Sequence, residues 1–462
     1  MTKWNPSIAD RSGPRYAAIV VELEEAVREG RLAPGDRLPP QRELADALDL
    51  SLGTVTRAYE EARDRGLVEA TVGRGTFVRH GAGEGEGAVG ARLDPDLADL
   101  SLLTAPVLDE EDWPGRLRSA ASALAGRADL ADLLGYQRHE GAARHRRAGA
   151  AWLGRTGLEA SPGDVLVTGS AQHAAVAALS VLTRPGDTVL AEELTNPGLR
   201  DAASWLGLRL HGLPMDGEGL IPDALESVCR SGVARVLYTM PTYQNPTART
   251  MSKKRRRRIA AIAAEHGVSV VEDGVHALLA GEAPAPLAAH LPDHGYFVTS
   301  HSKTLAPALR LGYLRAPSAA HEELRSALRA TMWMASPLLA EIATGWIEDG
   351  TADRLLEGKR AEARTRLEIA REALAGFDFT AGAASYHLWL GLPEGWRPDA
   401  FAREARRRGV AVAPPRGFVA GQVTTPRAVR LCPGSARDRE ELREGLAALR
   451  GLLEEGPIDG RG

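Results

Sequence analysis

One lysine in this 462-residue chain stands in a setting that suits covalent chemistry. Lys303 follows the apolar run 296–298, and Ser300, Ser302 and Arg310 lie on either side of it. An amine at the end of a buried strand can form a Schiff base with an aldehyde. Nearby hydroxyl and guanidinium groups can hold a phosphate dianion. The combination indicates pyridoxal phosphate, which carries both an aldehyde and a phosphate.

Three more polar motifs each follow a predicted strand. Ser170 and Ala171 open a predicted helix, whose free N–H groups and dipole favour a phosphate. Asn245 can donate to a phenolate oxygen, and a buried Asp273 beneath a pyridine ring would keep the ring nitrogen protonated. Because ligands of open α/β sheets bind at the carboxyl ends of strands, we expect these residues to lie together.

The elements that must position these residues alternate along the C-terminal three quarters of the chain. Apolar runs predict strands, and amphipathic stretches at 171–182 and 254–266 predict helices between them. The alternation is typical of an α/β domain with a mostly parallel sheet, here followed by a smaller C-terminal α+β part. The predicted strands are 165–168, 188–190, 233–240, 268–271 and 296–300.

The first 80 residues follow a different plan. Helical spacing predicts helices over 16–28, from 41 onward and over 52–64, and two short strands follow at 67–70 and 75–78. Three helices and a hairpin make a winged helix-turn-helix, a DNA-binding fold. Residues 1–80 hold 12 Lys and Arg against 13 Asp and Glu, so DNA binding must come from their arrangement and not from net charge.

Cysteine content, hydropathy and glycine content indicate the cell compartment and the domain boundaries. Cys229 and Cys432 are the only cysteines, so we expect a reducing cytoplasm and no disulfide framework. No apolar run is long enough for a membrane helix, and we expect no metal site. The Gly-rich stretch 81–88 predicts a flexible linker. We therefore expect a DNA-binding domain at 10–79, a linker at 80–99 and a cofactor domain at 100–456. The large part of that domain would span about 130–315 and the small part about 316–456.

The N-terminal segment resembles the GntR-type winged-helix domain. The match is carried by the runs 35–45 (GDRLPPQRELA) and 73–78 (GRGTFV), with Ser51, Thr54, Ala58 and Tyr59 between them. The resemblance implies that double-stranded DNA is a partner. It implies that one set of residues contacts the DNA: Arg42, Ser51, Thr54, Thr56, Arg57 and Arg74.

The rest of the chain resembles fold-type I aminotransferases, and the whole chain resembles MocR-type regulators, in which the two domains are fused. The resemblance implies a homodimer, a Schiff base at Lys303 and a grip on an effector carboxylate by Arg430. It implies that Asp273 pairs with the ring nitrogen of pyridoxal phosphate and that Asn245 binds the ring oxygen. The residues expected around the phosphate are Ser170, Ala171, Ser300, Ser302 and Arg310.

Two positions depart from the family pattern. His276 stands where the family usually has a tyrosine directed at the ring oxygen, and Asn196 stands where an aromatic often stacks on the ring. Loss of stacking would cost on the order of 1 kcal/mol of cofactor affinity. We still place both residues in the cofactor site.

Three functions are compatible with this sequence. The first is a regulator that binds pyridoxal phosphate and DNA and responds to an amino acid, another amine or the cofactor itself through exchange at Lys303. The second is an active aminotransferase that carries a DNA-binding domain, and the third is a DNA-binding module with a dimerisation scaffold. The retained lysine, aspartate and asparagine oppose the third, and His276 and Asn196 weigh against the second. The first is favoured, with little or no transaminase activity required.

Overall fold

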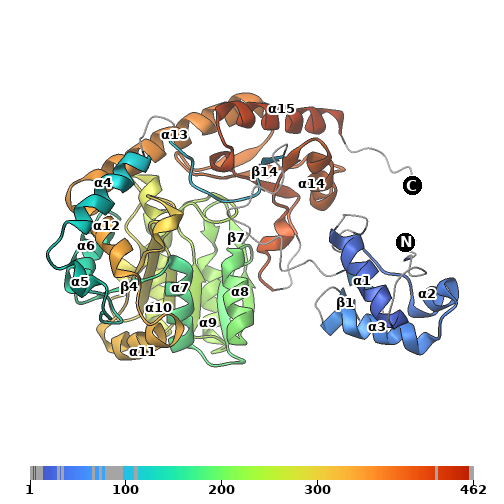
Figure 1. Ribbon diagram of the computed structural model, residues 1–462, viewed down its shortest axis with the longest axis horizontal. Coiled ribbons are helices and arrows are strands. Elements are labelled where there is room, and N and C mark those ends of the chain that lie inside the picture. Colours follow the sequence, from blue (N-terminus) through green and yellow to red (C-terminus); the bar gives the residue numbers. More distant parts are fainter. Residues whose placement is uncertain are drawn as a thin grey trace. The chain divides into compact units, whose positions relative to one another are not determined.

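The computed structural model describes residues 4, 6, 14–28, 32, 36–64, 68–71, 75–78, 97–108, 113–421 and 425–456. It divides into two compact units, Met1–Ala91 and Arg92–Gly462. Figure 1 shows the first unit in blue and the second in the remaining colours.

The first unit is the predicted winged helix-turn-helix. It contains α1 (Arg15–Arg28), α2 (Gln41–Leu48), α3 (Leu52–Asp64) and an antiparallel hairpin of β1 (Val68–Thr71) and β2 (Gly75–Val78). The apolar spacing that predicts these helices places side chains in the core, since Leu44, Val55 and Ala62 are all buried. Asp49 adopts a left-handed φ of 52° directly after α2, which ends that helix and turns the chain toward α3.

A seven-stranded sheet organises the second unit. Its strand order is β4-β12-β11-β10-β9-β5-β6, and all neighbours are parallel except β12, which runs antiparallel to both β4 and β11. The predicted α/β fold with a mostly parallel sheet is therefore confirmed. The strands are β4 (Val165–Thr168), β5 (Thr188–Glu192), β6 (Arg209–Leu213), β9 (Val236–Thr239), β10 (Ser269–Asp273), β11 (Gly295–Ser300) and β12 (Gly312–Arg315).

Helices cover both faces of this sheet because its strands are apolar on both sides. Leu166 and Val298 point into one apolar cluster with α7, while Val165 and Phe297 point into another with α6 and α12. The helices of this part are α4 (Trp113–Ala125), α5 (Leu130–Leu133), α6 (Ala143–Gly154), α7 (Ala171–Leu182), α8 (Pro197–Leu206), α9 (Pro222–Arg230), α10 (Lys253–Glu265), α11 (His321–Thr331) and α12 (Pro337–Glu348).

The smaller C-terminal part packs three antiparallel strands against long helices. Its sheet order is β13-β14-β16, and α13 and α15 run together along its outer side in Figure 1. A short strand that begins the unit, β3 (Ala98–Asp99), pairs in parallel with β15 (Val410–Ala411). The remaining elements are α13 (Thr351–Ala373), β13 (Phe379–Ala381), β14 (Leu388–Gly391), α14 (Pro398–Arg407), β16 (Ala428–Leu431) and α15 (Arg439–Glu455).

Short elements fill the connections of the second unit. They are the two-residue strands β7 (Met215–Asp216) and β8 (Gly219–Leu220) and the 3-10 turns η1 (Ala277–Ala280), η2 (Leu287–His290), η3 (Pro307–Leu309), η4 (Ser318–Ala320), η5 (Pro415–Phe418) and η6 (Pro433–Ser435). Across the residues that the structure describes, no helix combines the length and apolar character needed to cross a membrane.

Candidate functional site

One end of the candidate site is built where β4, β12 and β11 meet. The strand register sets Thr168, Gly312 and Ser300 side by side across these three strands. A Cβ on Gly312 would come within 2.6 Å of the Thr299 carbonyl oxygen and 2.8 Å of the Ser170 carbonyl carbon, so only glycine fits there. The close approach brings the loops after β4 and β11 together.

This end presents the groups that suit a phosphate. Ser170 caps α7, and its Oγ accepts a hydrogen bond from the His173 N–H at 3.0 Å. The first N–H groups of a helix, here from Ala171 onward, lack partners within the helix. Ser300 is buried and its Oγ accepts from the Ser302 N–H at 3.4 Å, while Arg310 lies exposed just before β12. We call Ser170, Ser300 and Gly312 the phosphate end.

Lys303 lies between this end and the smaller C-terminal part. Its Nζ donates to the backbone carbonyl of Leu103, and its own carbonyl accepts from the Tyr386 hydroxyl at 2.7 Å. The lysine is half-buried, and its positive charge acts on Asp273. Its amine therefore faces the interior of the site.

Asp273 ends β10 and forms the floor of the site. Its Oδ2 accepts from the Tyr238 hydroxyl at 2.5 Å, and its Oδ1 accepts from the Val275 N–H at 3.2 Å. Burial raises the pKa of Asp273, and the hydrogen bonds from Tyr238, Val275 and Asn196 together with the charge of Lys303 oppose that rise. A protonated pyridine nitrogen would supply the missing cation and hold the carboxylate ionised.

Arg430 reaches the site from β16, where it is completely buried. One guanidinium nitrogen donates to Asn245 Oδ1 at 2.6 Å, and another donates to the Ser101 carbonyl at 2.5 Å. The Phe418 ring lies 4.7 Å from the guanidinium carbon. Because the Asn245 side-chain oxygen accepts from Arg430, the side-chain nitrogen of Asn245 is the group that can donate to a ring oxygen. We call Arg430 and Asn245 the ligand end.

The two departures from the family pattern both make local hydrogen bonds. Asn196 caps α8, with its Oδ1 accepting from the Gly198 N–H at 3.1 Å, and its side chain acts to lower the pKa of Tyr238 and of Asp273. His276 Nδ1 lies 2.9 Å from the Tyr243 carbonyl oxygen, and its ring centroid is 5.5 Å from that of His387. Asn196 therefore lies near the predicted site residue Asp273, whereas the contacts described for His276 are to Tyr243 and His387, which were not predicted as site residues.

The residues brought together here fit pyridoxal phosphate by the chemistry of their donors. A buried carboxylate suits the ring nitrogen, an amide suits the ring oxygen, and a helix start with two serines suits the phosphate. Lys303 supplies the amine. Arg310 is the one predicted phosphate ligand that the structure leaves exposed to solvent.

Sequence reasoning missed four contributors to this site. Tyr238 sits in an apolar strand, so its hydroxyl gave no sign that it would meet Asp273. Tyr386 carried no motif. Ser101 and Leu103 act through backbone carbonyls, which any residue type could provide. Only the tertiary structure could reveal such contacts.

The predicted DNA-contacting residues lie on α2, α3 and the turn between them. Arg42 and Ser51 are exposed, and Ser51 Oγ lies 2.9 Å from Thr54 Oγ1. Thr56 donates to Gln41 Oε1 at 2.9 Å. The exposed Arg57 guanidinium stacks on the Tyr16 ring at 4.0 Å. Arg74 falls outside the described residues.

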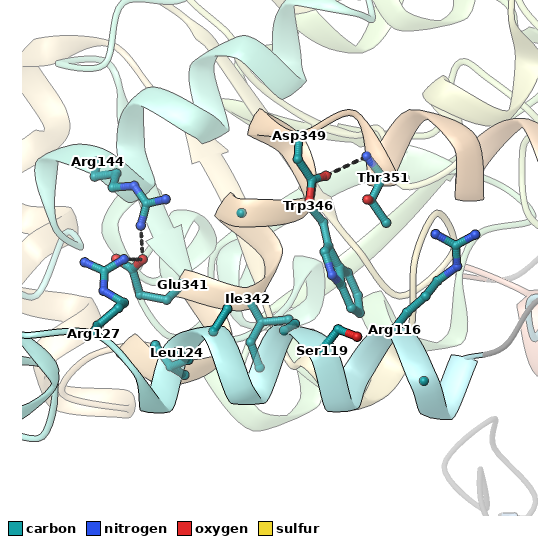
Figure 2. A pocket seen from close by; sticks show the side chains of 14 residues that line it. Arg116, Ser119, Leu124, Arg127, Arg144, Glu341, Ile342, Trp346, Asp349 and Thr351 are labelled. Carbon is teal, nitrogen blue, oxygen red and sulfur yellow. Dashed lines mark hydrogen bonds and ion pairs between the residues drawn. The ribbon is translucent and has the colours of Figure 1, made fainter.

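A cavity of about 770 Å³ lies elsewhere, between α4 and α12. Figure 2 shows Arg127 and Arg144 converging on Glu341 at one end of it. His145 Nε2 lies 2.7 Å from the other oxygen of the same carboxylate. Among the described residues that line this cavity, none belongs to the predicted cofactor site. Its charges are largely satisfied within the protein, so we do not assign the chemistry to it.

Each of the two units matches a different protein-family model. Residues 106–449 match the family model of aminotransferase class I and II. The chain belongs to the aminotransferase class I and II family. Residues 15–78 match the model of bacterial regulatory proteins of the gntR family, so this family member carries a DNA-binding domain in front of its aminotransferase-like domain.

Individual relatives support both assignments. The HTH-type transcriptional regulator YdeF of Bacillus subtilis (strain 168) is 32% identical over 98% of this chain and 97% of its own length. The HTH-type transcriptional regulator TauR of Rhodobacter capsulatus is 28% identical over 86% of this chain and 88% of its own. These full-length matches confirm the predicted MocR-type architecture.

A solved aminotransferase shares the fold of the second unit. It is LysN, the alpha-aminoadipate aminotransferase of Thermus thermophilus, in complex with N-(5'-phosphopyridoxyl)-L-leucine. It is 26% identical with a TM-score of 0.70, and the match covers 78% of this chain and 93% of that one. The predicted fold-type I class is confirmed.

Proposed function

We propose that an amino compound controls this regulator by displacing Lys303 from the cofactor, with the carboxylate of the compound, if it has one, held by Arg430. The chain is a DNA-binding transcriptional regulator with a pyridoxal phosphate domain. The observation that carries the proposal is the grouping of Lys303, Asp273, Asn245 and Arg430 in one buried site. The same chain has a complete winged-helix core.

Each residue has a proposed task in this site. The bound cofactor supplies an aldehyde that condenses reversibly with amines. Lys303 provides the resident amine, and Asp273 holds the proton on the ring nitrogen. Asn245 donates to the ring oxygen while its own oxygen aligns Arg430. Arg430 then binds the carboxylate of the incoming compound, where it has one, through two parallel hydrogen bonds.

The phosphate is proposed to bind at the start of α7. Ser170, Ala171, Ser300 and Ser302 surround that point, and Arg310 lies at the solvent side of it. Ser170 and Ser300 are buried, so their hydroxyls are fixed before the phosphate arrives. A rigid anchor lets the ligand end change its contacts without losing the cofactor.

Two side chains favour a regulator that binds an amino compound without transferring its amino group. Asn196 caps α8 and acts to lower the pKa of Asp273, and it is not an aromatic that can stack on the ring. His276 is directed at a backbone carbonyl of the Tyr243 segment. A sensor needs a conformational bias of only about 1–3 kcal/mol, which binding alone can supply. An active aminotransferase is the alternative, and transfer of amino groups from a panel of amino acids to a 2-oxo acid would identify it.

A second copy of the chain is proposed to dock beside the phosphate end. Leu134, Tyr136, Met332 and Trp333 are apolar side chains with 40–84% of their surface exposed. The Tyr136 and Trp333 rings lie 5.6 Å apart, so the side chains form one patch, and the Met332 sulfur borders Gly169. Exposed apolar patches of this kind mark interfaces. Trp333→Glu should turn a dimer into a monomer in light scattering, and a wild-type monomer at micromolar concentration would contradict the assignment.

We propose that the cell compartment is the cytoplasm, where DNA is accessible. The residues proposed to contact DNA are Arg42, Ser51, Thr54, Thr56, Arg57 and the wing residue Arg74. Arg57→Ala should weaken binding almost equally on all sequences and lower the salt slope by about one. Filter binding at several salt concentrations measures both. An unchanged slope would show that Arg57 does not touch a phosphate.

The test of effector sensing uses the full chain loaded with pyridoxal phosphate. DNA from upstream of its own gene is titrated with the protein in the presence of amino acids and amines. We expect at least one carboxylated amine to change the apparent affinity about 5-fold or more, Arg430→Ala to abolish that change, and the exposed Arg403→Ala to preserve it. A response that survives in Arg430→Ala would refute the role of Arg430.

A further inference from the structure

A short segment at the start of the second unit touches both groups that the proposed ligand needs. We call residues 98–106 the strap. Its Leu103 carbonyl accepts from Lys303 Nζ, and its Ser101 carbonyl accepts from Arg430 at 2.5 Å. These are the amine that holds the cofactor and the guanidinium that would hold a carboxylate.

The rest of the strap is fastened to the smaller C-terminal part. Leu100 donates to the Ala411 carbonyl at 3.0 Å and its own carbonyl accepts from the Cys432 N–H at 2.8 Å. Farther along, the Pro106 carbonyl accepts from Lys359 Nζ at 2.9 Å. The strap therefore spans Lys303 on the large part and β15, β16 and α13 on the small part.

One side chain sets the direction of the Ser101 peptide. Asp99 Oδ1 accepts from the Ser101 N–H at 2.9 Å and from the Ser101 hydroxyl at 2.6 Å. Such a turn, closed by an aspartate two residues back, fixes the local backbone. Asp99 touches neither Lys303 nor Arg430 in these contacts, so it controls the strap without belonging to the ligand site.

We infer that the strap carries the state of the ligand site toward the DNA-binding domain; this inference rests on the proposed function. The Ser101 carbonyl competes with a ligand carboxylate for the same face of the Arg430 guanidinium, and the Leu103 carbonyl competes with the cofactor aldehyde for the Lys303 amine. An amine that takes the aldehyde returns Lys303 to Leu103, so the carboxylate releases the strap at Ser101. In the chain, residues 79–96 join Val78 of the wing to Leu97, next to the strap. A ligand that displaces the strap therefore acts on the segment connected most directly to the winged helix.

If the Ser101 carbonyl competes with ligand for Arg430, loosening the strap should tighten ligand binding, whereas a loss of overall stability should weaken it. Asp99→Ala frees the Ser101 peptide, so the carbonyls compete less well and ligand should bind more tightly. N-(5'-phosphopyridoxyl)-L-leucine is a suitable probe because it carries the phosphate, the ring and a carboxylate in one molecule. We expect Asp99→Ala to bind it about 5-fold more tightly than wild type, or better, within the range of coupling between linked sites. A variant that was merely destabilised would bind it more weakly.

The experiment uses the full chain and three readouts: probe affinity, the effect of the probe on DNA affinity, and amide hydrogen exchange of the strap. In wild type the probe should raise strap exchange and alter DNA affinity. In Asp99→Ala exchange should be high already, and the probe should alter DNA affinity by less than half the wild-type factor. Ser101→Ala, which loses only the hydroxyl bond, should shift all three readouts in the same direction by less.

Asp349→Ala is the matched control, since Asp349 Oδ1 accepts from the Thr351 N–H at 2.8 Å in a turn of the same kind. Equal or weaker probe binding in Asp99→Ala, with a DNA response like that of wild type, would overturn the role of the strap and leave the proposed function intact. A wild-type chain whose DNA affinity ignores both the probe and every amine would overturn the proposed function itself.

Discussion

The phosphate end and the ligand end of the site are built in different ways. At the phosphate end, Thr168, Gly312 and Ser300 are neighbours in one sheet, and their positions follow from strand register. At the ligand end, Arg430 lies on the small sheet and bonds Asn245, a residue 185 positions away, and Ser101, a residue 329 positions away. The first end is set within one sheet, whereas the second joins segments that lie far apart in the sequence.

The difference suits a sensor. A cofactor held at the sheet edge, as we propose, would stay bound while the groups at the other end exchange partners. Ligand-driven change requires a ligand to favour one arrangement over another, and our inference assigns the second arrangement to Arg430 released from the Ser101 carbonyl. A site built wholly within the sheet would bind its ligand without passing on the event.

The largest expected effect is on the cofactor spectrum, and it comes from replacing Lys303, which lies between the two ends of the site. Lys303→Ala should abolish the visible absorbance of the covalently bound cofactor, because no other residue of the site offers an amine. Cofactor should still bind non-covalently through the phosphate end, which equilibrium dialysis can detect. Lys254→Ala, an exposed lysine on α10, is the control. An unchanged spectrum in Lys303→Ala would place the amine elsewhere.

The second prediction breaks the phosphate end itself. In Gly312→Ala the new Cβ would meet the Thr299 and Ser170 backbones at 2.6 and 2.8 Å, and a backbone cannot swing away as a flexible side chain can. We expect a loss of about 3 kcal/mol of unfolding free energy, the upper range for overpacking, and weaker binding of inorganic phosphate. Gly217→Ala, with nothing within 4 Å, should change neither quantity. Wild-type stability in Gly312→Ala would show that the three strands are less rigid than their register indicates.

The contrast between the ends also explains what could be predicted from the sequence. The helices at 16–28 and 52–64 match α1 (Arg15–Arg28) and α3 (Leu52–Asp64) closely, because their apolar spacing is local. The strand expected at 233–240 is shorter, with β9 limited to Val236–Thr239, since Val233 and Ala234 lie outside any regular element and Val233 is exposed. The antiparallel β12 was not foreseen, because its four residues carry no pattern that distinguishes them from a loop.

For the site, motifs that follow strands could be found, and partners supplied by distant backbone could not. The predicted residues around Asp273 and Arg430 lie together, although their individual roles remain predictions. The Ser101 and Leu103 carbonyls have no side-chain signature. The side chains at both ends could thus be named from the sequence, whereas the strap carbonyls that contact the ligand end needed the tertiary structure.

The third prediction concerns pH and the sheet beneath the site. Burial raises the pKa of Glu192 to about 7, above its ordinary value, while its bonds from Thr239 and Met240 oppose the rise. A carboxyl group whose pKa is higher in the folded than in the unfolded chain favours folding most at a pH below its unfolded pKa. For Glu192 this stability is lost as pH rises from the ordinary value of 4.5 through about 7. Glu192→Gln copies the protonated form, so it should unfold less readily than wild type above about pH 7, by at most about 3 kcal/mol.

Chemical denaturation at about pH 5, 7 and 8.5 measures this difference. A residual slope should persist in Glu192→Gln because burial also raises the pKa of Glu272 to about 7. The exposed Glu372→Gln serves as the control. If Glu192→Gln and wild type lose stability in parallel across this pH range, Glu192 is ionised throughout and the sheet edge does not limit stability at high pH.

The smallest effect tests whether the floor of the site belongs to the rigid end. Tyr238 lies in β9 and donates to Asp273 Oδ2 at 2.5 Å from a fully buried position. Tyr238→Phe removes one donor to a buried carboxylate and should cost about 1–3 kcal/mol of unfolding free energy. Because that donor opposes the rise in the pKa of Asp273, its loss should raise the pKa further and weaken the carboxylate as a partner for a ring nitrogen. Cofactor affinity should fall several-fold, while the strap, which contacts neither residue in the described hydrogen bonds, should keep its wild-type hydrogen exchange. If strap exchange rises in Tyr238→Phe, the floor is coupled to the ligand end, and the two ends of the site move as one.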